Sequence, residues 1–371
     1  MTTHADDPHF LRLAFVRGAG SLAAHKLLSE LGDISAVFHA SSGTLSRIVG
    51  DAVARKILAI PDAETQAKID EALTWLNANL DHHLLTWAHP SYPKALLESG
   101  DAPLVIYAKG RLELLSHGAI AMVGSRNCSQ SGTDTAEAFA QAFAERGVTV
   151  VSGMALGIDS ASHVGALRTK GNHCGSTIAV IGTGIDRVYP ARNKVLAHSI
   201  AEQGLMLSEY PLGTPPLPAN FPKRNRIISG LSLGVLVVEA SMASGSLITA
   251  RFAGEQGREV FAIPGSIHST FHKGCHHLIK QGAKLVETAN DVLDELRLET
   301  VASSNDAAPQ RATENPAAFG LLKFIEHTPI DVDMLVARSA MNVEQVVTEL
   351  TMLELDGSIE QLPGGRWQRR G

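Results

Sequence analysis

Cysteine is scarce in this chain: 3 cysteines occur among 371 residues, and no two of them form a CxxC pair. So few cysteines exclude the disulfide framework of a small secreted domain. No run approaches the roughly 18 apolar residues that a membrane-spanning helix needs. The first residues, MTTHADDPHF, lack the basic and then apolar layout of a signal peptide. These absences predict a cytoplasmic protein with no membrane span.

Signatures of common cofactors are absent as well. No GxxxxGK(S/T) P-loop occurs, and the turn Gly182–Asp186 lacks a GxGxxG spacing because Arg187 occupies the place of the last glycine. The histidines and the cysteine between His268 and His277 do not repeat elsewhere with the ligand spacing of a zinc site. We therefore expect neither a nucleotide cofactor nor a bound metal.

The charges of the chain are unevenly distributed. The formal net charge is −6, yet the segment from His163 to Arg226 has eight Lys and Arg residues against three acidic residues, which makes it +5. A local cationic excess of this kind indicates a binding site for a polyanion.

The middle of the chain, from about Leu84 to Leu298, alternates short apolar strands with amphipathic helices. The expected strands are 119–123, 149–151, 178–181, 205–207, 235–238, 260–263 and 284–286, and the clearest helices are 133–146, 160–170, 194–202 and 247–256. This alternation is typical of a parallel sheet covered on both faces. Ligands of such sheets bind beyond the carboxyl ends of the strands.

The flanks of this region have different patterns. Residues 13–28 and 45–60 form a weak repeat of helix, glycine-containing turn and helix. This repeat is typical of helix–hairpin–helix units that bind phosphate, or of a small helical packing module. After a polar stretch at 300–316 that resembles a flexible linker, helices expected at 317–326, 332–338 and 343–355 precede a hairpin from 358–361 to 366–368. That order predicts a winged helix.

We therefore predict four segments: a helical domain at 1–80, an α/β domain at 81–298, a linker at 299–315 and a winged helix at 316–371. The last segment carries five positive and eight negative charges, and its helix 343–355 has no Lys or Arg. A helix that reads DNA needs cations or amides facing the groove. The winged helix is thus better suited to a protein partner.

The segment Phe221–Ser232, FPKRNRIISGLS, concentrates cationic charge. If Pro222 is the first residue of a helix, its cations crowd the end where the helix dipole already carries about half a positive charge: Lys223, Arg224 and Arg226. A bound anion would turn this repulsion into attraction. The alternative is that Glu209 or Glu239 neutralises one or two of these cations.

Three loops that follow expected strands share a small-residue character: 123–126, 152–159 and 182–186. Their glycine amides and hydroxyls, together with nearby cations, are expected on one rim of the sheet. Phe221 and Tyr189 add aromatic surfaces beside the cations, although Phe221 could instead pack beneath its helix. Stacked bases, at about 1–3 kcal/mol each, combined with phosphate contacts are how single-stranded nucleic acid is held without sequence reading.

Several motifs together resemble the DNA-processing protein A (DprA/Smf) family: VGSR at 123–126, SGMALGIDSASH at 152–163, AVIGTGIDRVYP at 179–190, LSEYPLG at 207–213, FPKRNRIISGLS at 221–232, EASMASGSLITARFA at 239–253, and FAIPGSIHSTFHKGCHHLIKQGAKLV at 261–286. The resemblance is close over 120–298 and looser at the flanks. It implies an extended Rossmann-like α/β core between an N-terminal SAM-like or helix–hairpin–helix-like domain and a C-terminal winged helix.

The resemblance also implies a function. Members of this family bind single-stranded DNA, dimerise, protect incoming DNA during natural transformation and help to load the RecA recombinase, with no catalytic reaction and no cofactor. Where the family often has further lysines, this chain has Ala191 and Pro218. Which cations replace those lysines stays open.

The loops and the resemblance together predict one set of DNA-binding residues: Gly124, Ser125, Arg126, Ser152, Gly153, Gly157, Gly184, Arg192, Lys194, Phe221, Lys223, Arg224, Asn225 and Arg226. A second set is expected at a dimer interface along an apolar sheet edge: His276, Ile279 and Leu285.

Two other functions compete with this interpretation. A nucleotide-processing enzyme of related fold would need a carboxylate at a strand end, and Glu239 is the candidate. A protein scaffold would bind no nucleic acid. Ser125 and Ser152 lack the context of a nucleophile elbow, and Asp159 and His163, four residues apart on one helix, are expected to pair or to cap that helix.

Overall fold

The computed structural model describes residues 6–171, 175–298, 321–325, 329–339, 341–362 and 364–369. The linker expected at 299–315, Cys174 and half of the helix expected at 317–326 lie outside these residues. Among the described residues, no helix combines the length and the apolar character needed to cross a membrane. The domain boundaries drawn from the sequence stay predictions.

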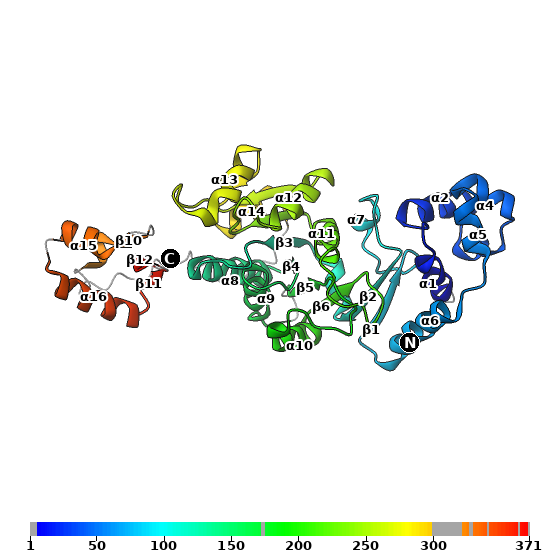
Figure 1. Cartoon of the computed structure of the whole chain (residues 1–371), viewed down its shortest axis with the longest axis horizontal. Coiled ribbons are helices and arrows are strands. Elements are labelled where there is room, and N and C mark those ends of the chain that lie inside the picture. Colours follow the sequence, from blue (N-terminus) through cyan, green and yellow to red (C-terminus); the bar gives the residue numbers. More distant parts are fainter. Residues whose placement is uncertain are drawn as a thin grey trace.

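Six short helices form the N-terminal region: α1 (Asp7–Phe15), α2 (Ser21–Leu31), α3 (Ile34–His39), α4 (Ser42–Val49), α5 (Asp51–Leu58) and α6 (Ala63–Ala78). Both repeats are helix, glycine turn and helix, with Gly18 at φ +97° and Gly50 at φ +81° in the two turns. Leu27 and Leu45 belong to the same buried core as Tyr107 of the neighbouring sheet. The helical region therefore packs directly on one edge of the sheet (Figure 1).

The central sheet has nine strands in the order β1-β2-β6-β5-β4-β3-β7-β8-β9. They are β1 (His82–Thr86), β2 (Val105–Gly110), β3 (Ala119–Val123), β4 (Thr149–Ser152), β5 (Thr177–Val180), β6 (Leu205–Ser208), β7 (Gly234–Val237), β8 (Glu259–Ala262) and β9 (Lys284–Leu285). The strands from β3 to β9 pair in parallel and confirm the strands predicted from the sequence.

One edge of the sheet is antiparallel, which the sequence did not predict. β1 pairs antiparallel with β2, and β2 pairs antiparallel with β6. β1 and β2 were both missed by the sequence prediction, and the HHLLT sequence of β1 offers only Leu84 and Leu85 as an apolar run. The short helix α7 (Lys94–Leu97) and a long connection separate it from β2, so no tight-turn signal marks the pair.

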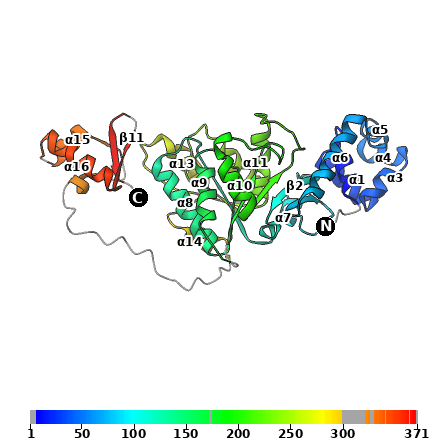
Figure 2. The same ribbon diagram turned by 90° about the horizontal axis from the view of Figure 1, so that it is seen from below.

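Helices cover both faces of the sheet. α8 (Gln130–Glu145), α9 (Ile158–Leu167) and α10 (Lys194–Gln203) lie below it in Figure 1 and face the viewer in Figure 2. α11 (Asn220–Gly230), α12 (Ser246–Glu255) and α13 (Lys273–Lys280) lie above it in Figure 1. α14 (Ala289–Glu295) contributes Val292 and Leu293 to the same buried core as α8.

The chain changes direction in the sheet between β3 and β7. From β3 it proceeds through β4 and β5 to β6 on one side, and then crosses back so that β7 pairs with β3 on the other side. The loops after β3 and β7 therefore diverge, and ligands of open α/β sheets bind at such a topological switch point.

The C-terminal region contains η4 (Leu321–Phe324), β10 (Ile330–Asp331), α15 (Val332–Ser339), α16 (Val343–Leu355), β11 (Ile359–Leu362) and β12 (Arg366–Arg369). Its three strands have the order β10-β12-β11, and Leu335, Leu350 and Trp367 belong to a core of their own. The helices predicted at 332–338 and 343–355 and the hairpin are confirmed, whereas the described part of the helix predicted at 317–326 is the short 3-10 turn η4.

The close packing of α8 against α9 can be tested by a substitution. A Cβ added to Gly165 of α9 would stand 2.2 Å from the carbonyl oxygen of Glu137 on α8. Because the backbone cannot move aside as a side chain can, we expect Gly165→Ala to lower the free energy of unfolding by about 1–3 kcal/mol.

Gly254→Ala in α12 is the matched control, since no atom lies within 4 Å of its added Cβ. The control should be neutral or stabilising by about 0.4–1 kcal/mol. Urea denaturation measures both, and equal effects would contradict the helix contact.

Candidate functional site

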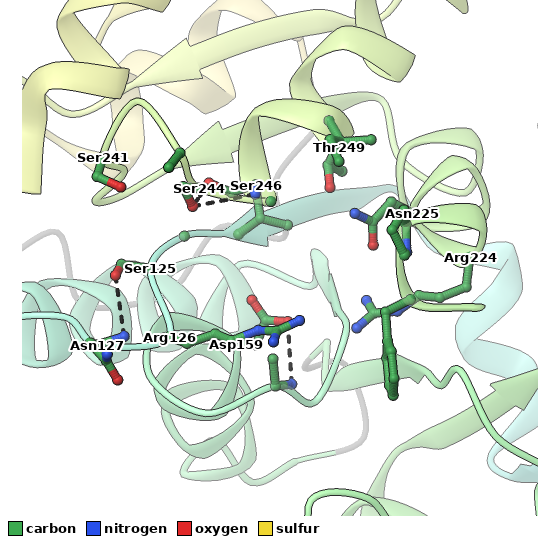
Figure 3. A pocket seen from close by; sticks show the side chains of 18 of the residues that line it. Ser125, Arg126, Asn127, Asp159, Arg224, Asn225, Ser241, Ser244, Ser246 and Thr249 are labelled. Carbon is green, nitrogen blue, oxygen red and sulfur yellow. Dashed lines mark hydrogen bonds between the residues drawn. The ribbon is translucent and has the colours of Figure 1, made fainter. Parts of the chain in front are cut away.

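A cavity of about 530 Å³ opens at the carboxyl ends of β3 and β7 (Figure 3). Its wall includes residues 123–127 after β3, residues 241–249 around the start of α12, and part of α11. Asp159 and Tyr189 also line it. The cavity therefore occupies the switch point that the strand order defines.

Arg224 reaches the cavity from α11 with only 5% of its surface exposed. Its Nη2 donates to the carbonyl oxygen of Gly153, after β4, at 2.8 Å. A Cβ at position 153 would stand 1.6 Å from Nη1, so glycine is needed to leave room for the guanidinium. Burial lowers the pKa of Arg224, although a guanidinium keeps its proton in proteins. In the described part of the chain its Nε has no hydrogen-bond partner.

Asp159 binds the loop after β4 from the first turn of α9. Its Oδ2 accepts hydrogen bonds from the amides of Gly153 at 3.2 Å and Ala155 at 3.3 Å. Burial raises the pKa of this carboxyl, while the neighbouring Arg224 acts in the opposite direction. The expected pairing with His163 is therefore wrong: Asp159 caps a loop, and its carboxylate lies beside the buried arginine.

His163 also holds the loop after β4 by a hydrogen bond. Its Nε2 accepts from the amide of Met154 at 3.2 Å, and its Nδ1 lies 2.6 Å from Thr177 Oγ1. Since Thr177 Oγ1 donates to the carbonyl of Val150 at 2.8 Å, Nδ1 carries the proton and the imidazole is neutral. Burial lowers the pKa of His163 to about 3, and the charge of Arg224 acts in the same direction. Met154 has φ +57°, and these contacts hold that left-handed conformation.

Arg126 enters the cavity from the side opposite Arg224, and Figure 3 shows the two guanidinium groups pointing into the same space. Gly124 and Ser125 line the cavity beside it. Gly157 supports this loop from behind, because a Cβ there would meet the carbonyl oxygen of Ser125 at 2.3 Å. The residues 124–126 predicted from the sequence thus meet Arg224 and Asn225 at one cavity.

Arg226 departs from its predicted place. Its side chain is 7% exposed, its Nη2 lies 2.6 Å from Glu209 and its Nε lies 2.8 Å from Asp101. Arg226 does not line the cavity, and its ion pairs connect α11 to the neighbouring loops. The alternative prediction, that Glu209 neutralises one of the cations, is therefore correct for Arg226. Lys223 is exposed and 3.6 Å from Glu209. The helix also begins at Asn220, two residues before the predicted Pro222.

The aromatic residues form a pair at the rim. The ring centroids of Tyr189 and Phe221 are 5.3 Å apart. Phe221 lies over Gly182, whose added Cβ would meet its ring at 2.9 Å. Tyr189 is 48% exposed, so one face of the pair is open to a stacking partner.

The remaining predicted residues do not line the cavity. Ser152 is buried and donates to the carbonyl of Met122 at 2.6 Å. Gly184 is buried beneath the 211–214 loop. Arg192 and Lys194 are exposed at the start of α10. These two residues add positive charge outside the cavity.

Sequence reasoning missed the neutral part of the wall. Ser241, Ser244, Ser246 and Thr249 line the cavity from the loop after β7 and the first turn of α12. The segment appears among the family motifs, but no role was assigned to its hydroxyl groups. The topological switch point was the signal that could have found them.

Glu239, the candidate catalytic carboxylate, is engaged elsewhere. It is 2% exposed, and it accepts from the amide of Ser129 at 2.9 Å and from the hydroxyl of Ser129 at 2.6 Å. An added Cβ on Gly132 would stand 2.4 Å from its carboxyl carbon. Glu239 therefore stabilises the start of α8 and lies outside the cavity wall.

The expected self-association region lies at the other sheet edge. His276 Nε2 is 2.9 Å from the carbonyl oxygen of Gly265, and Ile279 packs against the core. Leu285 in β9 is 46% exposed, with Ile267 at 68% and Phe271 at 38% among the exposed apolar residues. In the described residues no group of three His, Cys, Asp or Glu side chains could hold a metal ion.

Comparisons with known proteins place these features in a family. The family model described as DNA recombination-mediator protein A matches residues 83–297, and the model described as DprA winged helix domain matches residues 305–365. Protein Smf of Escherichia coli is 42% identical over 318 residues, covering 84% of this chain and 83% of that protein. DNA processing protein DprA of Streptococcus pneumoniae is 52% identical over 204 residues, covering 55% of this chain and 71% of that protein.

Solved structures agree with the sequence matches. The X-ray structure of DNA processing protein A from Streptococcus pneumoniae superposes with a TM-score of 0.66 at 39% identity, covering 80% of this chain and 99% of that one. A structure of DNA processing protein A from Helicobacter pylori, whose description concerns its single-stranded DNA binding mode, has a TM-score of 0.52 at 28% identity. It covers 58% of this chain and 96% of that one.

The buried His163 predicts acid sensitivity of the fold. Its folded-state pKa of about 3 lies below the unfolded value of about 6.5, so the unfolded chain binds the proton more readily. The stabilisation is therefore complete above about pH 6.5 and is lost as the pH falls toward 3. We expect this residue to account for a loss of about 2 kcal/mol between pH 7 and pH 5.

Denaturation of wild type and His163→Gln at both pH values measures that loss. The substitution should reduce the pH dependence by about 2 kcal/mol, whatever its effect on stability at pH 7. The control His198→Gln removes an exposed histidine of α10 and should keep the wild-type slope. An unchanged slope in His163→Gln would show that the buried imidazole does not carry the effect.

Proposed function

The chain belongs to the DNA recombination-mediator protein A family, and from this premise we propose that it binds single-stranded DNA at the cavity between β3 and β7. The convergence of Arg126 and Arg224 on that cavity is the observation that carries the proposal. Both cations face a space large enough for part of a nucleotide chain.

The surroundings suit a single strand better than a duplex. The Tyr189–Phe221 pair offers an aromatic surface at the rim of the cationic cavity, and an unpaired base has a free face with which to stack. Arg192 and Lys194 add exposed positive charge at the start of α10, outside the cavity. The description of the Helicobacter pylori relative names single-stranded DNA as its ligand, which supports the same class for this chain.

A purely binding role agrees with the geometry of the carboxylates. The cavity contains Asp159, whose Oδ2 accepts from two loop amides, and Glu239 serves the start of α8. Glu239 lies outside the cavity wall, and the Oδ2 of Asp159 is engaged by the loop after β4. We infer a protein that protects and presents single-stranded DNA during transformation, with RecA as the recipient recombinase; the recombination-mediator description of the family supports that role.

The cations predict a specific salt dependence. Five of them remain for phosphate once Arg226 is assigned to Glu209 and Asp101: Arg126, Arg192, Lys194, Lys223 and Arg224. About five phosphate contacts give a slope of log K against log salt near −3.5 for a single strand. Fluorescence anisotropy with oligo-dT between about 50 and 200 mM salt measures it. A flat dependence, or equal affinity for a duplex, would refute the proposal.

Arg126→Ala should weaken binding irrespective of sequence and reduce the magnitude of the slope by about 0.7. Arg251→Ala is the matched control, because Arg251 lies on α12 with its side chain 66% exposed and pairs with Glu255. The control should leave affinity and slope unchanged. If both substitutions had the same effect, net charge rather than the cavity would determine binding.

We also propose that the α13–β9 edge joins two copies of the chain. β9 ends the sheet, so its outer backbone groups are available for strand pairing. Ile267, Phe271 and Leu285 expose apolar surface nearby. His276 and Ile279 would support this surface from α13.

Leu285→Glu should weaken self-association at least tenfold, because a carboxylate would be desolvated between two copies. Sedimentation velocity over a concentration series measures the dimer dissociation constant. Leu80→Glu is the control, since Leu80 is 75% exposed and belongs to the N-terminal region. A wild-type protein that stays monomeric, or a Leu285→Glu variant that dimerises normally, would contradict the assigned edge.

A further inference from the structure

The outward surface of α16 combines apolar and acidic side chains. Val346 and Leu350 form the buried face of this helix. On the other side, four apolar residues expose between 48% and 81% of their surface, and two acidic residues are exposed among them. We call these six residues the α16 face: Val343, Glu344, Val347, Met352, Glu354 and Leu355. Since residues four apart are neighbours on a helix, Val343, Val347 and Leu355 follow one stripe.

The charges of the α16 face exclude two kinds of partner. This helix has the place of the DNA-reading helix of a winged helix, but it carries no Lys or Arg, and its carboxylates repel phosphate. A second α16 face would bring like charges together, which is unfavourable at an interface. No ion pair in the described part of the chain engages Glu344 or Glu354. The face therefore suits a surface that combines cations with apolar side chains.

A surface of that kind lies beside the DNA cavity. Arg192 and Lys194 are exposed at the start of α10, and the next residue, Val195, is 79% exposed. The segment from Tyr189 meets α11 where its ring contacts Phe221 at 5.3 Å, two residues before the exposed Lys223. We call this set the cationic rim: Tyr189, Arg192, Lys194, Val195 and Lys223. The described residues form no ion pair with Arg192 or Lys194, whereas Lys223 lies 3.6 Å from Glu209.

The length of the chain allows the two surfaces to meet. Figures 1 and 2 both show the winged helix apart from α10, so the α16 face is uncovered in this arrangement. Between Leu298 and Leu321 the sequence has 22 residues, which can span up to about 75 Å. A domain of about 220 residues is only about 45 Å across. Because both surfaces belong to one chain, each is at a high effective concentration for the other, and a weak contact is enough to populate.

We propose that the α16 face docks on the cationic rim of the same chain and competes there with single-stranded DNA. This inference rests on the proposed single-strand binding and adds its regulation. Glu344 and Glu354 pair with Arg192 and Lys194, and the apolar stripe covers Val195 and Tyr189. A strand that occupies the rim releases the α16 face. By reciprocity, a protein that binds the released face strengthens DNA binding by the same factor.

Removal of apolar surface tests the docking without a change in charge. Leu355 is 81% exposed, so Leu355→Ser should fold as wild type does. If about two thirds of the molecules are docked, only a third can bind DNA, and loss of docking tightens oligo-dT binding about threefold. Fluorescence anisotropy with the full chain measures this change. Ile60→Ser is the matched control, because Ile60 is 90% exposed in the N-terminal region, and it should bind as wild type does.

A double-mutant cycle tests whether the two surfaces meet. Val195→Ser on the rim should also tighten oligo-dT binding about threefold, because it removes the other side of the same contact. The double variant should then bind no more tightly than either single variant. Independent effects that multiply to about ninefold, or an unchanged affinity in Leu355→Ser, would overturn the docking.

Chemical cross-linking tests the contact without DNA. A carbodiimide joins a carboxylate to an amine that it touches, so Glu344 or Glu354 should become linked to Lys194 or Lys223 within one chain, as mass spectrometry of the monomer band shows. Excess oligo-dT should suppress these links. Links that persist with DNA, links only between copies, or links to Lys26 and Lys56 of the N-terminal region instead would overturn the docking and leave the proposed function intact. Absence of oligo-dT binding in wild type and in both variants would overturn the proposed function.

Discussion

The buried guanidinium of Arg224 is the interaction on which the site depends. Burying a cation is costly unless polar groups surround it, and here the Gly153 carbonyl and the nearby Asp159 carboxylate compensate. The contact requires a residue without Cβ at position 153. It therefore couples three elements: α11, which carries the arginine; the loop after β4, which accepts its hydrogen bond; and α9, whose first turn supplies Asp159.

That coupling explains why the loop after β4 is so heavily restrained. Met154 adopts a left-handed conformation at φ +57°, and bonds on both sides of it hold that geometry. His163 binds its amide, and Asn193 donates to its carbonyl at 2.9 Å. Since a strained loop keeps its shape only when its surroundings determine it, the neutral His163 matters as much as the charged residues. Placement of Arg224 is thus fixed before any ligand arrives.

Much of the architecture could be predicted because apolar periodicity determines parallel strands, and all strands from β3 to β9 were found. The same periodicity missed β1 and β2, whose pairing depends on neighbours distant in sequence. In the site, the sequence shows which residues are cationic, but it does not show which groups each cation contacts. Arg224 and Arg226 are two residues apart on α11, yet one faces the cavity and the other is held by Glu209 and Asp101. Only tertiary contacts distinguish them.

The neutral wall escaped prediction for a different reason. Serine and threonine are common in loops, so nothing in Ser244, Ser246 or Thr249 sets them apart until the strand order brings β7 beside β3. Topology then places the first turn of α12 opposite Arg126 and Arg224. A cationic surface alone attracts any polyanion, because Coulomb attraction acts over several ångströms and is not directional. Hydrogen-bond donors at fixed positions add the directionality that Coulomb attraction lacks.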